Sequence, residues 1–153
     1  MERETPVNEL AQALVGARSR FEMPVRWGDL DALNHVNNTL YFRYLEESRV
    51  DRFRAAGIGV SSERRNIVLA RTTCDFLRPI LWPATLRIEM EIQRVGRSSL
   101  EYQAELHVVD DEAGPCARAQ NIIVGTDAGT GKSSPWTPAE LQGLARVFVP
   151  PKA

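Results

Sequence analysis

The feature that most constrains this chain is a change of hydrophobic period in its first half. Residues 38–56 place apolar side chains at helical spacing, and Gly57 follows as a helix-ending glycine. For the next sixty residues the period is two, which is typical of β-strands with one face in water. A long helix followed by several strands predicts an α+β fold in which an antiparallel sheet packs against that helix.

The strand signals are punctuated by turn residues, so individual strands can be separated. The predicted strands are 20–27, 66–77, 86–93, 100–108 and 117–126. The second and fifth are the more apolar, which predicts that both of their faces are covered. Pro24 indicates that the first strand is an edge strand or that the proline lies at its start. Because their connections are short, we expect the second to fourth strands to be antiparallel neighbours. Short helices are predicted at 7–16 and at 137–146, where a capping box begins with Thr137.

Length and charge exclude several classes of protein. A chain of 153 residues with 43% hydrophobic residues favours one domain, spanning 1–153. Nineteen basic and twenty acidic residues give a net charge of −1, so we expect neither nucleic acid nor a membrane as a partner. The N-terminus carries no secretory or transit signal, which makes the cytoplasm the expected location. Two cysteines, Cys74 and Cys116, are too few for a four-ligand zinc site, and no metal is expected.

Polar residues are concentrated in the loop just before the long helix. Asn37 and Asn38 can be interpreted as capping residues, because a helix N-terminus leaves free N–H groups. One helix cap needs only one or two such side chains, so Asp31 and His35 are candidates for a functional role. The free amides and the positive end of the helix dipole favour a carbonyl oxygen that becomes an oxyanion, beside which a carboxylate can act as nucleophile or general base. This pattern favours acyl-transfer chemistry.

The same residues carry a family resemblance. Residues 27–49, WGDLDALNHVNNTLYFRYLEESR, resemble the signature of hot-dog-fold acyl-CoA thioesterases of the 4-hydroxybenzoyl-CoA thioesterase type. Residues 76–79 (FLRP) and 95–99 (VGRSS) resemble that family's second-strand end and its turn between the third and fourth strands. The resemblance covers about residues 20–126. It implies a hot-dog fold, a five-stranded antiparallel sheet wrapped around a long central helix. Outside this core we expect an N-terminal helical extension in 1–19 and a C-terminal loop and helix in 127–153.

The resemblance also implies roles for particular residues. Asp31 matches the catalytic carboxylate, and the backbone amide of Asn38 matches the group that polarises the thioester carbonyl. His35 matches a histidine of the branch that includes plant acyl-carrier-protein thioesterases, where it orients substrate or water. Those plant enzymes place an asparagine two positions before the histidine, where this chain has Leu33. This difference shifts the expected catalytic role to Asp31.

Further residues are candidates for substrate binding. An arginine pairs with phosphate oxygens in a fork, so Arg97 can be interpreted as a contact to the phosphates of coenzyme A, or as a hairpin arginine that needs no ligand. Some related enzymes use a glutamate of the helix as a base, and either Glu46 or Glu47 can be interpreted in this way or as a solvated helix charge. The candidate substrate-binding residues are Asn37, Tyr41, Glu47, Arg97 and Ser98.

Together these observations predict hydrolysis of acyl-CoA to a free acid and coenzyme A. Coenzyme A would be part of the substrate, and no separate cofactor is expected. The alternatives are a non-catalytic acyl-CoA-binding module and an acyl-carrier-protein thioesterase. By resemblance the protein is a homodimer or homotetramer with its site between subunits. The acyl group and the choice between dimer and tetramer stay open.

Overall fold

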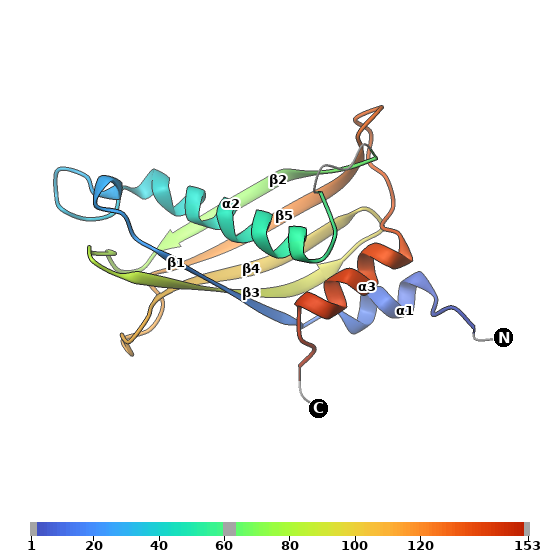
Figure 1. The fold of residues 1–153 in the computed structure, drawn as a ribbon, viewed down its shortest axis with the longest axis horizontal. Helices are drawn as coiled ribbons and strands as arrows, with labels where there is room; N and C mark the ends of the chain where they lie inside the picture. Colours follow the sequence, from blue (N-terminus) through green and yellow to red (C-terminus); the bar gives the residue numbers. More distant parts are fainter. Residues whose placement is uncertain (1–2, 60–63, 152–153) are drawn as a thin grey trace.

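The computed structural model describes residues 3–59 and 64–151, and these form one antiparallel sheet with three α-helices (Figure 1). The elements are α1 (Val7–Ala13), β1 (Arg18–Pro24), the 3-10 turn η1 (Trp27–Asp29), α2 (Asn38–Ala55), β2 (Arg65–Phe76), β3 (Thr85–Val95), β4 (Ser99–Val108), β5 (Ala117–Asp127) and α3 (Pro138–Val147). The α+β prediction and all five strands are confirmed. Within the described residues, no helix has both the length and the apolar character needed to cross a bilayer.

The sheet has the order β1-β3-β4-β5-β2, and α2 lies across one of its faces (Figure 1). The alternation read from the sequence decides which side chains meet this helix. On β3 the four residues Leu86, Ile88, Met90 and Ile92 are fully buried, whereas the charged residues between them point to the opposite face. Helices α1 and α3 lie side by side at one end of the sheet, close to both chain termini (Figure 1).

Strand β2 does not lie where the short connections predicted. It pairs with β5 at the edge of the sheet and is not a neighbour of β3. Residues 77–84 cross the end of the sheet, and the reason is the burial of Ile80, whose side chain is 0% exposed and whose carbonyl accepts from the Val36 N–H at 2.9 Å. The connection therefore closes the end of the core instead of forming a hairpin.

Two further expectations are corrected. The first strand ends at Pro24 and not at residue 27, because residues 27–29 turn into η1. The predicted burial of both faces of β2 is wrong for the chain alone, since Val68 is 50% and Leu69 38% exposed. Among residues 3–59 and 64–151, nothing covers the exposed apolar side chains of β2.

Candidate active site

The loop between β1 and α2 is organised around one buried carboxylate. Asp29 accepts hydrogen bonds at Oδ2 from the Arg26 N–H (3.0 Å) and from the Tyr44 hydroxyl (2.7 Å), and its carbonyl accepts from the Asn37 N–H (2.9 Å). Burial and the hydrogen bond to Asp29 both raise the pKa of Tyr44, so the phenol stays protonated as the donor. These bonds fix both ends of the loop to α2. The sequence analysis gave Asp29 no separate role, although an aspartate beside an aromatic-rich helix was the available signal.

Asp31 sits in a tight turn closed by the backbone of His35. The Asp31 N–H donates to the His35 carbonyl (2.8 Å), and the Asp31 Oδ1 accepts from the Leu33 N–H (2.8 Å). Asn34 supplies the sharp bend, with φ at 59°, in the left-handed region that asparagine tolerates better than most residues. The turn orients the carboxylate and holds it next to His35. It leaves Oδ2 outside the hydrogen bonding of the turn.

Helix α2 begins beside this turn. Asn37 is the N-cap, and its side chain accepts from the Thr39 N–H (3.0 Å) and hydroxyl (2.9 Å). Asn38 is the first helical residue, and in the described part of the chain no acceptor takes its N–H. The first amides of a helix carry the positive end of the dipole. The capping interpretation of Asn37 is therefore supported, while the Asn38 N–H points out of the helix start as a donor.

A surface hollow of about 300 Å³ brings the predicted residues together. Asp31, His35, Asn38 and Tyr41 all line it. Its other walls are Leu33, Val36, Phe76, Leu77, Arg78 and Pro79. Tyr41 packs its ring on Phe76 with centroids 4.9 Å apart, and burial raises the pKa of its hydroxyl. The FLRP segment thus contributes a wall of the hollow, a role that the sequence analysis did not assign.

Four predicted residues do not line the hollow, and the first of them, Asn37, serves as the N-cap of α2. The Glu47 carboxylate is 3.8 Å from the Arg26 guanidinium and does not line the hollow. Arg97 and Ser98 lie in the β3–β4 turn, where the Ser98 carbonyl accepts from the Gly125 N–H near the end of β5. The hollow is at the opposite end of the sheet, because its wall residue Phe76 pairs with Ala117 at the start of β5. The single chain therefore does not bring Arg97 or Ser98 to Asp31.

The two cysteines do not offer a nucleophile. Burial raises the pKa of Cys74 to about 11 and also raises the pKa of Cys116. Since the thiolate is the reactive form, both thiols stay protonated at neutral pH. The carboxylate of Asp31 is thus the candidate nucleophile or base of the hollow.

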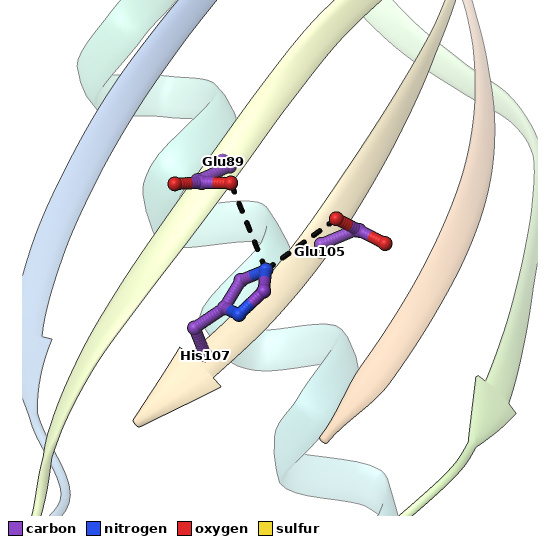
Figure 2. Close-up of side chains that lie close together, drawn as sticks. All are labelled: Glu89, Glu105 and His107. Atoms are coloured by element: carbon purple, nitrogen blue, oxygen red, sulfur yellow. Dashed lines mark hydrogen bonds and ion pairs between the residues drawn. The ribbon is translucent and has the colours of Figure 1, made fainter. Parts of the chain in front are cut away.

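The side chains that could hold a metal ion lie away from the hollow. Among the described residues, the metal-ligand types converge in one group, Glu89 of β3 with Glu105 and His107 of β4 (Figure 2). These residues are on the face of the sheet opposite α2. The hollow itself combines a carboxylate, an imidazole and a free helix amide, an arrangement suited to polarising a carbonyl group and activating a nucleophile towards it.

Comparisons with known proteins identify the family of this chain. Residues 25–144 match the model of the thioesterase-like superfamily. The uncharacterised Bacillus subtilis protein YsmA is 30% identical over 125 residues, which are 80% of this chain and 82% of that protein.

Solved structures show the same architecture. A candidate thioesterase of Pseudomonas aeruginosa superposes with a TM-score of 0.74 at 36% identity, covering 78% of this chain and 92% of that one. A 1,4-dihydroxy-2-naphthoyl-CoA thioesterase of Synechocystis has a TM-score of 0.73 at 17% identity, covering 84% of this chain and 96% of that one, and at this identity it shows the fold alone. The fold is the hot-dog fold of these neighbours, and this chain belongs to the thioesterase-like superfamily.

Proposed function

We propose that this protein hydrolyses acyl-CoA thioesters, as the 4-hydroxybenzoyl-CoA thioesterase type does, with Asp31 as the catalytic carboxylate. The observation that carries the proposal is the shared hollow, in which Asp31 stands beside the free N–H of Asn38 at the start of α2. Family membership supports thioester hydrolysis. We propose in addition that the thiol of the substrate is coenzyme A.

The chemistry follows from the two groups. The thioester carbonyl oxygen accepts from the Asn38 N–H, which stabilises the negative charge of the tetrahedral intermediate. Asp31 either takes a proton from an attacking water or attacks the carbonyl carbon itself, forming an anhydride that water then cleaves. The C–S bond breaks, and the thiolate of coenzyme A leaves and takes up a proton. The imidazole of His35 lies in the same hollow and orients the substrate or the water.

The proposal includes a second copy of the chain. Strand β2 is an edge strand with exposed apolar residues, and on α2 Phe42 and Val50 are also 40% and 50% exposed. The opposite edge of the sheet, β1, is partly covered, because Arg18 forms an antiparallel β-bridge with Val149. Antiparallel pairing of two β2 strands would cover this apolar surface and let the sheet continue through both chains.

Such pairing would also complete the site. In an antiparallel pair the end of β2 at Phe76 lies beside the start of β2 in the other copy. The Ser98 carbonyl accepts from the Gly125 N–H (2.7 Å), and Gly125 pairs with Ile67 near that start. The β3–β4 turn of one copy would therefore approach the hollow of the other. This would give Arg97 and Ser98 access to the coenzyme A portion of the substrate.

The test measures thiol release from a panel of acyl-CoA esters by wild type and by Asp31→Asn. We expect the variant to lose at least about 100-fold in kcat, because a positioned acid–base group contributes that much. The matched control is Asp110→Asn, an exposed residue in the β4–β5 turn at φ 68°, a conformation that asparagine accepts. The control should keep wild-type turnover.

Each other result has a definite meaning. Wild-type-like turnover of a folded Asp31→Asn protein would remove Asp31 from the mechanism. Tight binding of the esters without thiol release would indicate a binding module instead of an enzyme. Release from acyl carrier protein but not from coenzyme A would indicate the acyl-carrier-protein thioesterase.

A further inference from the structure

A second group of reactive side chains lies on the face of the sheet that α2 does not cover. Glu89 and Glu105 are directly opposite each other on β3 and β4, and His107 follows two residues after Glu105 on the same face. Figure 2 shows both carboxylates turned toward the imidazole. The side chains of the three residues are 31%, 25% and 14% exposed, so the histidine is the most enclosed of the three.

The contacts within this group are long, and the hydrogen bond between His107 and Glu105 is at 3.4 Å, so their spacing also suits a shared cation. The His107 Nε2 lies 3.6 Å from Glu89 Oε2 and 3.4 Å from Glu105 Oε1. Ordinary N–H···O hydrogen bonds are shorter, about 2.7–3.2 Å. A tetrahedral metal ion with ligands at 2.0–2.1 Å, by contrast, places neighbouring ligand atoms about 3.4 Å apart. The imidazole is therefore already at ligand–ligand spacing from both carboxylate oxygens.

The remaining carboxylate oxygens are held by arginines. Glu89 Oε1 is 3.0 Å from Arg87 Nε and 3.5 Å from Arg20 Nη2. Glu105 Oε2 accepts two hydrogen bonds from Arg118, at 2.9 and 2.7 Å. Each carboxylate thus uses its outer oxygen for an arginine and presents its inner oxygen to His107. Outer partners of this kind orient the carboxylates of metal sites in the same way.

We propose that Glu89, Glu105 and His107 bind a zinc ion on the outer face of the sheet. One imidazole nitrogen with two carboxylate oxygens suits Zn²⁺ better than Mg²⁺ or Ca²⁺, which favour oxygen ligands alone. Two carboxylates balance the divalent charge, and water completes the tetrahedron. The charges of Arg20, Arg87 and Arg118 oppose the cation, so the expected affinity is micromolar. The ion would join β3 to β4 away from the thioester site, independently of the proposed hydrolysis.

The chain offers a sharp test because it contains two histidines, His35 and His107. The untagged, chelator-treated full chain is titrated with ZnCl₂ by calorimetry and by NMR of the imidazole protons. We expect one zinc ion per chain, with a shift of the His107 signals and little change at His35. Glu105→Gln and His107→Gln should each weaken binding at least tenfold. The matched control, His35→Gln, should bind zinc as wild type does.

Three outcomes would overturn the site: no binding in the micromolar range, binding that moves only the His35 signals, or binding that survives His107→Gln unchanged. The NMR measurement on the wild-type chain decides the question even if a variant fails to fold. MgCl₂ in place of ZnCl₂ should give no saturable binding below the millimolar range. Equal affinity for the two ions would contradict an imidazole ligand.

Discussion

At the scale of single residues, Asp29 and Asp31 have different roles although they are two positions apart. Asp29 is 8% exposed and is used entirely for holding the loop, through Arg26, Tyr44 and its own carbonyl. Asp31 shares only one oxygen with its turn and lines the hollow. The proposed catalytic carboxylate of Asp31 therefore depends on its buried neighbour Asp29 for its position.

Removing the hydroxyl that binds Asp29 tests this dependence. Tyr44→Phe should lower the free energy of unfolding by about 1.5–3 kcal/mol, because it removes a hydrogen bond to a buried carboxylate. It should also lower kcat, since the loop that carries Asp31 loses its anchor on α2. Urea unfolding and the thioesterase assay measure the two effects.

The matched control is Tyr102→Phe, which removes a hydroxyl that accepts from Arg49 Nη1 at 3.1 Å, away from the loop. We expect this control to lose stability while keeping its kcat. Unchanged turnover in Tyr44→Phe would show that the loop holds Asp31 without the hydrogen bond from Tyr44 to Asp29.

At the scale of elements, α2 is fixed at its far end by a close approach of α3. Gly143 of α3 is buried, and a Cβ added there would overlap the carbonyl oxygen of Ala56, the C-cap of α2. Backbone atoms cannot move aside as a flexible side chain can. A residue with no side chain is therefore required at this crossing.

Gly143→Ala should destabilise the protein by about 1–3 kcal/mol, the usual cost of overpacking, because the two helices must separate. Thermal and urea unfolding measure the change. The control, Gly28→Ala, places its Cβ where no atom lies within 4 Å, and we expect a change within about 0.5 kcal/mol. Equal free energies of unfolding for Gly143→Ala and Gly28→Ala would mean that α3 can move away from α2 without loss of stability.

At the scale of the whole molecule, β2 is an edge strand whose apolar side chains are exposed to solvent. Val68→Glu places a charge on an apolar residue that is 50% exposed, so the isolated chain should tolerate it. If two β2 strands pair, the charge lies in the interface and separates the copies. In sedimentation equilibrium we expect wild type at two or four times the 17.1 kDa chain mass, and the variant at a lower mass because its β2 strands no longer pair.

The Val68→Glu variant should have a lower kcat as well as a lower molecular mass, because each hollow would lose the β3–β4 turn of the other copy. Val149→Glu, at the opposite edge of the molecule and 64% exposed, is the control and should keep the mass and the activity of the wild type. A wild-type monomer with full activity would refute the proposed pairing.

The helices, the strands and the position of the candidate site could be predicted from the sequence. The alternation of β3 and β4, the capping box of α3 and the polar run before α2 act locally, so they can be read from neighbouring residues. The run from Asp31 to Asn38 is short enough that residues predicted together were also found in one hollow.

Tertiary structure alone decided which distant segments meet. The burial of Ile80 sends β2 to the far edge beside β5, and no local pattern specifies that crossing. The same crossing brings Phe76 and Arg78 to the hollow and leaves Arg97 at the other end of the sheet. It also left the apolar face of β2 open, because a sequence shows that a strand is apolar but not whether its cover comes from the same chain. Long-range pairing is set by the packing of the whole core, and that information is distributed over the entire chain.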